Sequence, residues 1–492
     1  MKRNTILPFC LFTLLLFLAA CTETVIDAKQ EAAQPQIYPD YLGVTVPVNI
    51  APLNFCMADE KALLIDAVIT DRHGHSLHSQ GSEAVDFDLD DWHALLGQNR
   101  GDSLSVTVSA KYGDGWHTYC PFSIYVNSDS IDYGICYRLI EPGYEVWSKM
   151  GIYERDLSSF EERALIENTQ FEGCVNCHSF NRGNPEDMSL HIRGPHGATL
   201  LRHSGGPFTA YNTKTDRTLG FCVYPYWHPS GRYIAYSTNA TSQLFHSADR
   251  NRVEVFDTAS DLQVYDVEKN ELLLSPLLKQ DSVYETYPVF SADGRSLYFC
   301  AAHALPEDSH QLDSIHYNLC RIDFDPATGT FGDQIDLVVD AAAQQKSVSF
   351  PRPSYDGRFL CYTLSDYGQF SIWHHEADLY LLYLSTGESR SMTEANSKDT
   401  ESFHNWSANS RWLVLSSRRD DGLFTRPYFC HVDANGAVTK AFMLPQRNPR
   451  RFYQGRFLSF NVPEFITAPT RFDGRKASRI INDEYRKNFG VR

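Results

Sequence analysis

The segment Cys174-Val175-Asn176-Cys177-His178 has the residue types and spacing that most directly indicate chemistry. Two thiols three positions apart can form thioether bonds to the two vinyl groups of one haem, and the histidine that follows can bind its iron. The pattern therefore predicts a single covalently bound haem c. Cys174 and Cys177 would be its attachment points, and His178 would be the proximal iron ligand.

Two other uses of this segment are a redox disulfide and a structural zinc site. A redox Cys-x-x-Cys pair normally opens a helix within a βαβ unit, and no such pattern surrounds Cys174. A zinc site needs four ligands, which Cys174, Cys177, His178 and His191 could supply. Neither alternative explains a histidine directly after the second cysteine.

The sixth position of a haem iron here could be taken by Met188 or His191, which follow the motif closely. A methionine ligand would raise the reduction potential, whereas a second histidine would lower it. An unfilled sixth position would instead allow peroxide or small-gas chemistry.

The first residues of the chain have the pattern of a bacterial lipoprotein signal. Lys2 and Arg3 precede an apolar run over residues 6–20, which is too short for a spanning helix, and Cys21 follows small residues. We expect residues 1–20 to be a cleaved signal peptide, Cys21 to be lipidated, and polar residues 21–36 to be a tether. The protein would then be a membrane-anchored, extracytoplasmic lipoprotein, either periplasmic or on the outer membrane of a Gram-negative bacterium.

The overall charge narrows the classes of partner. The chain has 44 basic and 61 acidic residues and a net charge of −17, which argues against nucleic-acid binding. A protein partner with a basic patch is expected instead. Aromatic residues make up 13% of the chain, which favours strands over helices.

The region before the haem motif divides into two parts. Residues 37–141 contain short alternating strands separated by Gly-rich turns, which predicts a small β-sandwich-like domain. Residues 142–194 are expected to be a linker that carries the motif. Asp156 and Ser158 stand before residues 160–166 like helix N-cap residues, so a short helix is predicted there.

An internal repeat dominates the rest of the chain. Four similar segments begin at Pro225, Pro288, Pro351 and His404, and their turn residues are Gly231, Gly294, Gly357 and Ser410. Each segment is a tight turn followed by a strand that cannot bury its own face, so the units must stack against one another. This predicts an all-β fold with a five- or six-bladed β-propeller over residues 195–465 and a tail over 466–492. The first and last blades are expected near residues 196–220 and 457–465.

These repeats resemble the TolB-type propeller repeat, whose signature is P-x-[FW]-S-x-D-G-x-x-[IL]-x-[FY]. The match is strongest in the second and third segments; Pro353 and Asn409-Ser410 depart from it. With the haem motif and the stretches 45–55 and 137–144, the chain is similar to a family of Gram-negative anaerobes often labelled "cytochrome c biosynthesis protein" or "TolB-like". The resemblance implies a haem-bearing propeller lipoprotein, and a haem-attachment motif marks a carrier of haem, not its ligase.

The sequence is compatible with three functions. The chain could be an electron carrier whose propeller docks a redox partner, a binding protein for a protein or glycan in which the motif is structural or sensory, or an enzyme with an open haem site. No G-x-S-x-G hydrolase motif is present. A disulfide between two of Cys56, Cys120 and Cys136 is possible, and its pairing cannot be deduced from the sequence.

Overall fold

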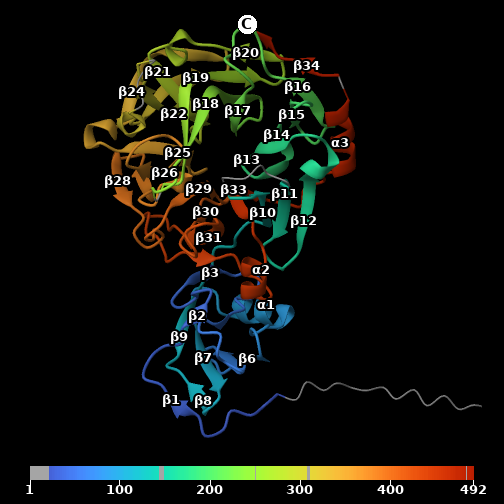
Figure 1. Ribbon diagram of the computed structural model, residues 1–492, viewed down its shortest axis with the longest axis vertical. Helices are drawn as coiled ribbons and strands as arrows, with labels where there is room; N and C mark the ends of the chain where they lie inside the picture. Colours follow the sequence, from blue (N-terminus) through green and yellow to red (C-terminus); the bar gives the residue numbers. More distant parts are fainter. Residues whose placement is uncertain (1–21, 143–148, 250, 307–310, 484, 492) are drawn as a thin grey trace, which may run out of the picture.

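The computed structural model describes residues 22–142, 149–249, 251–306, 311–483 and 485–491. They form an N-terminal β domain below a larger ring of β-sheets (Figure 1). The all-β class predicted from the sequence is confirmed. Cys21, where lipidation is expected, lies outside the described residues.

The N-terminal domain contains a seven-stranded sheet, a two-stranded ribbon and one helix. In the sheet, β7 pairs with β5, β8 and β9, while β2 and β4 form the ribbon. The bounds are β1 (Lys29–Gln30), β2 (Ile37–Tyr38), β3 (Thr45–Pro47), β4 (Cys56–Met57), β5 (Leu64–Thr70), β6 (Ser76–Gly81), α1 (Leu89–Gln98), β7 (Ser103–Tyr112), β8 (Gly115–Thr118) and β9 (Phe122–Asn127).

The helix α1 was not expected from the sequence, although its signals are present there. The side chain of Asp88 accepts hydrogen bonds from the backbone N–H groups of Asp90 and Asp91, as a helix N-cap does. Trp92 and Leu96 then fall on the face that packs into the core.

The ring consists of six four-stranded blades within the described residues. Blade one contains β10 (Gly134–Ile140), β11 (Gly151–Asp156), β12 (Glu162–Glu167) and β33 (Ser459–Ile466); blade two contains β13 (Cys174–Asn181), β14 (Asn184–Arg193), β15 (Ala198–Arg202) and β16 (Thr209–Asn212); blade three contains β17 (Val223–Trp227), β18 (Tyr233–Phe245), β19 (Val253–Asp266) and β20 (Glu271–Leu273); blade four contains β21 (Val283–Phe290), β22 (Ser296–His303), β23 (Asn318–Asp325) and β24 (Thr330–Val339); blade five contains β25 (Ser347–Pro353), β26 (Phe359–Ser365), β27 (Asp378–Tyr383) and β28 (Glu388–Ser391); blade six contains β29 (Glu401–Trp406), β30 (Trp412–Ser417), β31 (Arg426–His431) and β32 (Phe442–Met443). Short 3-10 helices cover residues 168–170, 276–278, 312–314, 342–344 and 371–373.

The ring is closed by a strand from late in the chain. β33 pairs antiparallel with β10, so blade one combines three strands that precede the haem motif with one strand that follows blade six. The propeller therefore begins at residue 134 and not at residue 195 as predicted. The segments proposed for the first and last blades do belong to the ring, in blades two and one.

The predicted repeats are the inner hairpins of blades three to six. Their turn residues Gly231, Gly294, Gly357 and Ser410 have φ angles of 76°, 73°, 72° and 57°. A tight turn with positive φ is the feature that the sequence predicted at these positions. The serine therefore adopts the same left-handed conformation as the three glycines.

The helix predicted within residues 160–166 is wrong, because this segment is strand β12. Asp156 does act as a cap, but of a turn: its carboxylate accepts hydrogen bonds from the N–H and the hydroxyl of Ser158, both at the start of the β11–β12 connection. The same residues favour helix caps and such turns, and pairing with β11 over residues 162–167 decides between them. The haem motif thus lies in a blade strand and not in a helical linker.

The segment after β33 also packs against the ring. Helix α3 (Gly474–Asn482) buries Ala477 and Ile481, while β34 (Lys487–Asn488) and β35 (Gly490–Val491) add to the outer strands of blades two and three. The short helix α2 (Pro449–Gln454) precedes β33 and lies near the N-terminal domain (Figure 1). The C-terminal region predicted as a tail is therefore part of the fold.

The N-terminal domain and the propeller share one hydrophobic core. A single cluster of buried side chains runs from Val46 and Trp92 to Leu413 and Phe442. Hydrogen bonds cross the junction as well: the indole of Trp412 donates to the carbonyl of Asp129 at 3.2 Å.

Candidate functional site

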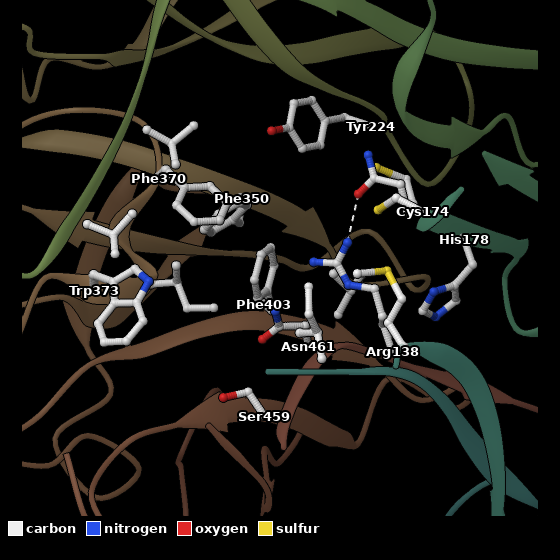
Figure 2. Close-up of a pocket in the computed structure, with 18 of the residues that line it drawn as sticks. Arg138, Cys174, His178, Tyr224, Phe350, Phe370, Trp373, Phe403, Ser459 and Asn461 are labelled. Atoms are coloured by element: carbon white, nitrogen blue, oxygen red, sulfur yellow. Dashed lines mark hydrogen bonds between the residues drawn. The ribbon is translucent and has the colours of Figure 1, made fainter. Parts of the chain in front are cut away.

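A cavity of about 370 Å³ lies where the inner strands of the blades converge. This volume falls in the usual range for small-molecule and cofactor sites, roughly 300–1,000 Å³. The haem motif forms part of the wall: Cys174, Cys177 and His178 all line the cavity. Figure 2 shows Cys174 and His178 on one side and Trp373 on the other, with Phe350, Phe370 and Phe403 between them in this view.

The inner strands of blades three to six carry the same backbone irregularity. The pairing of blades three to six shifts next to Tyr224, Tyr287, Phe350 and Phe403, and these four residues have φ angles between 43° and 52°. Bulky side chains rarely adopt this conformation, and such strain persists mostly at functional sites. All four aromatic residues line the cavity.

The haem motif occupies the equivalent bulge of blade two. The pairing of β13 with β14 shifts between Val175 and His178, so Asn176 and Cys177 are the bulged residues. A bulge re-aims side chains that a regular strand would place on alternate faces. Cys174, Cys177 and His178 therefore face one cavity although they lie on a strand.

His178 is a buried histidine available to a ligand. It is 3% exposed, and neither ring nitrogen makes a hydrogen bond of good geometry to another described residue. Burial lowers the pKa of His178 to about 4, the charge of Arg138 acts in the same direction, and the backbone of Cys136 opposes them. The imidazole is thus neutral at physiological pH, which is the form that binds a metal.

Both thiols of the motif are free and partly accessible. Cys174 and Cys177 are of intermediate exposure and are not joined to each other. Burial raises the pKa of the Cys174 thiol, opposed by the nearby guanidinium groups of Arg138 and Arg193. Arg138 is itself held against the motif, since its Nη1 donates to Oδ1 of Asn176 at 2.7 Å (Figure 2).

The cavity is positively charged although the chain is acidic overall. Its lining includes the arginines 138, 193, 352 and 418, with Glu141 as the acidic residue among the described ones. The net charge of the chain is −17. A site that concentrates cations in an anionic protein is suited to an anionic ligand.

Part of the cavity wall comes from a two-stranded arm. Beyond Ser237 and Leu262, β18 and β19 pair only with each other among the described strands, out to Phe245 and Val253 (Figure 1). Thr241, Gln243, Val253 and Val255 of this arm line the cavity.

The arm from blade three is fastened to blade five. Glu254 is 5% exposed and accepts hydrogen bonds from the Tyr367 hydroxyl at 2.7 Å and from Nε2 of His374 at 3.0 Å. Nδ1 of His374 contacts Glu376 at 3.2 Å.

The two residues predicted as sixth iron ligands lie away from the cavity. Met188 is 1% exposed in a core cluster with Phe180, and His191 contacts the Thr199 hydroxyl at 3.0 Å. Neither belongs to the residues that line the cavity. Met150, just before β11, does line it and is 1% exposed, so it is the thioether among the described residues that shares the cavity with His178.

The position of Met150 could not be found from the sequence, because it depends on blade one forming before the motif. The aromatic residues of the bulges could have been found. Tyr224, Tyr287 and Phe350 directly precede the prolines of the repeats and recur every 63 residues.

The other cysteine and metal predictions receive no structural support. Every cysteine of the described ranges is free, including Cys56, Cys120 and Cys136. Over the same ranges, no group of three or more His, Cys, Asp or Glu side chains is arranged to hold a metal ion. His191 does not join Cys174, Cys177 and His178 at the cavity. No helix in the part of the chain that the structure describes is long and apolar enough to cross a membrane.

Comparisons with known proteins find only remote structural likenesses. No family model and no curated protein matches the sequence. Among solved structures, a DUF4784 family protein from Bacteroides caccae is 8% identical over 73% of this chain and 95% of that chain, with a TM-score of 0.31. The periplasmic gluconolactonase PpgL of Pseudomonas aeruginosa is 14% identical over 81% and 99%, with a TM-score of 0.34. An oligogalacturonate lyase in complex with manganese is 13% identical over 64% and 74%, with a TM-score of 0.36. At these values the likenesses carry no argument, so the fold rests on the sheet topology of this chain and any function rests on its site. By its own sheet topology, the chain is a six-bladed β-propeller protein with an N-terminal β domain and a central cavity.

Proposed function

We propose that this protein is a monohaem c-type electron carrier whose haem lies in the central cavity of the propeller. The observation that carries the proposal is His178: its two ring nitrogens are buried and lack hydrogen-bond partners in the described structure, and the thiols of Cys174 and Cys177 share its cavity. A buried polar group without a partner costs free energy, so a ligand that completes it is the simplest explanation.

The residues of the cavity suit such a group. The Cys174 and Cys177 thiols would each add across one vinyl double bond, sulfur to one carbon and hydrogen to the other, and His178 would bind the iron. Phe350, Phe403 and other aromatic side chains offer an apolar surface for a flat ring. A haem held in this way supplies a one-electron redox couple.

Met150 is the proposed sixth ligand, in place of Met188 and His191. It lines the cavity with His178, whereas the other two side chains pack elsewhere. Methionine ligation would raise the reduction potential relative to a second histidine. The placement of blade one in the ring thus changes the ligand that we propose.

The signal-like segment and the charge set the proposed surroundings. The protein would be anchored through lipid on Cys21 outside the cytoplasm, and its acidic surface would dock a redox partner with a basic patch. Electron transfer to such a partner should slow as ionic strength rises. A rate that does not depend on salt would contradict this mode of docking.

The test of the haem is the visible spectrum of the mature protein expressed with a haem-attachment system. We expect a sharp reduced α-band that survives denaturation in the wild type and in C120S, which removes a thiol of the N-terminal domain. C174S/C177S should lose the covalently bound pigment. A wild-type protein without such a band would refute the proposal and leave a propeller-based binding protein.

The second candidate function is that of a binding protein for an organic anion. It is favoured by the four arginines of the cavity. Their guanidinium groups would donate hydrogen bonds to carboxylate or phosphate groups whether or not haem is present.

A further inference from the structure

Arg418 is a buried cation that forms no direct ion pair with another described residue. It is 2% exposed, and no carboxylate of the described residues lies within 4.0 Å of its nitrogens. Its Nε donates to the carbonyl of Ile372 at 2.7 Å, and Nη1 donates to the carbonyl of Leu423 at 2.6 Å. These two bonds fix the orientation of the guanidinium group, and both of its acceptors are neutral carbonyl oxygens.

The guanidinium group rests on an aromatic ring at the cavity wall. Its carbon lies 3.3 Å from the centroid of the Trp373 ring, and both residues line the cavity. The ring offsets part of the cost of burying the charge. Burial nevertheless lowers the pKa of Arg418 to about 9, although the charges of Asp399 and Asp421 act in the opposite direction.

A comparison with other buried arginines shows that this arrangement is unusual. Arg155 is also buried, but its Nη2 donates to a backbone carbonyl away from the cavity. Arg426 is 2% exposed and donates to the carbonyls of Leu458 and Tyr453, also outside the cavity. Arg418 combines this kind of burial with a place on the cavity wall.

We propose that Arg418 and Trp373 form a carboxylate-binding subsite of the central cavity. The ligand is an organic acid with a flat apolar body, because Phe350, Phe370 and Phe403 lie between this subsite and the haem motif in Figure 2. The guanidinium group binds the carboxylate, and the rings pack against the body of the ligand.

This carboxylate has two possible sources. The propionates of a haem leave the macrocycle at the edge away from its vinyl groups, so a haem fixed at Cys174 and Cys177 would extend them toward the opposite wall. The other source is a free aromatic acid. The haem source rests on the proposed function, whereas the free-acid source does not.

The first arm of the test uses the haem-free C174S/C177S protein and isothermal titration calorimetry. Benzoate is the probe, and benzamide is its uncharged match in shape. We expect benzoate to bind about tenfold or more tightly than benzamide, and R418Q to abolish this preference. The matched control is R426Q, which removes a buried arginine with the same kind of carbonyl bonds and should keep the preference. If R418Q does not fold, R418K is the second variant. Lysine keeps the charge but lacks the planar guanidinium group, so R418K should reduce the preference for benzoate.

The second arm uses the haem-loaded protein and separates the two sources. If propionates occupy the subsite, loaded protein no longer binds benzoate, and R418Q lowers the reduction potential while R426Q does not. If the natural ligand is a free acid, benzoate binds the loaded protein and the potential is unchanged in R418Q. Equal binding of benzoate and benzamide by the haem-free protein, together with an unchanged potential in R418Q, would overturn the subsite. Failure of haem attachment with a benzoate preference that depends on Arg418 would refute the proposed function and leave the subsite standing.

Discussion

Two side chains of the central cavity lack the partners that buried polar groups normally have. His178 has no hydrogen bond of good geometry to either ring nitrogen within the described ranges, and Arg418 forms no direct ion pair there. Since each defect lowers the stability of the isolated chain, both residues are better explained by a bound ligand than by the fold. In a view across the cavity, the motif and Trp373 lie at opposite sides (Figure 2).

The residue-scale prediction concerns Met150. In the haem-loaded, reduced protein, we expect the wild-type spectrum to be insensitive to carbon monoxide, because the proposed Met150 thioether would fill the sixth position. M150L should bind carbon monoxide and show a shifted spectrum, along with a lower reduction potential.

The matched control for Met150 is M188L. Met188 is equally buried but lies in the core cluster with Phe180 and Leu190, outside the cavity. If carbon monoxide binds M188L and not M150L, the sixth ligand is assigned to the wrong methionine.

At the scale of elements, local sequence predicted the repeated hairpins and the short strands of the N-terminal domain, and it missed blade one. The hairpins after Pro225, Pro288 and Pro351 were identifiable because a turn with positive φ needs particular residues. Blade one was missed because β10 and β33 are more than 300 residues apart, and only their pairing makes either a propeller strand. Likewise, β12 has the local signals of a helix and is a strand through pairing with β11.

The site was predictable only in part for the same reason. The spacing of Cys174, Cys177 and His178 is local, so the motif was evident without a structure. Met150 and Arg418 reach the cavity from blades one and six, which no local pattern indicates.

The hydrogen bonds that hold the β18–β19 arm against blade five should make the free energy of unfolding depend on pH. Burial alone would lower the pKa of His374, but its hydrogen bonds to Glu254 and Glu376 raise it to about 9 from the usual 6.5. A histidine with a raised pKa contributes stability below its unfolded pKa and loses it as pH rises through the folded one. We expect the free energy of unfolding to fall by an amount on the order of 2 kcal/mol between pH 6.5 and 9.

Chemical denaturation across this pH range measures the effect. H374N, which cannot carry the charge, should show a flatter profile and a lower stability at pH 6.5. H431N is the control, because His431 contacts Asp129 and lies outside the arm. If the free energy of unfolding of H374N depends on pH as that of the wild type does, the charge of His374 does not hold the arm in place.

The arm should also control access to the motif. Replacing residues 242–256 with Asn-Gly joins Thr241 to Asp257 through a two-residue hairpin turn, since these two residues are paired in the structure. In the haem-free protein, we expect iodoacetamide to modify Cys174 and Cys177 several-fold faster than in the full-length chain. Mass spectrometry measures the modification of the two cysteines relative to that of Cys120, which serves as the internal reference. Equal relative rates would mean that the arm does not cover the cavity.

At the scale of the whole molecule, closure by β33 holds the ring together. β33 supplies Ser459, Asn461 and Val462 to the cavity wall, and Glu464 accepts a hydrogen bond from the N–H of Phe180 in blade two at 2.9 Å. A shared core also joins the N-terminal domain to blades five and six. The described parts should therefore unfold as one cooperative unit.

Truncation tests this dependence. A chain that ends at residue 457 lacks β33 and should lose cooperative unfolding in differential scanning calorimetry. A chain that ends at residue 473 lacks α3, β34 and β35 but keeps six complete blades, so it should retain one transition at a lower temperature. Cooperative unfolding of the shorter chain would show that the ring does not need its closing strand.

Closure by a late strand has a consequence for the order of maturation. If the chain is exported as proposed, β33 emerges after all the other blade strands, so the ring stays open until almost the whole chain has crossed the membrane. The proposed haem could approach Cys174 freely during that interval, whereas after β33 docks it would have to enter the cavity of a closed ring. The covalent attachment of haem would then be a step that precedes folding, and an attachment system acting on this chain would compete with the docking of a single strand.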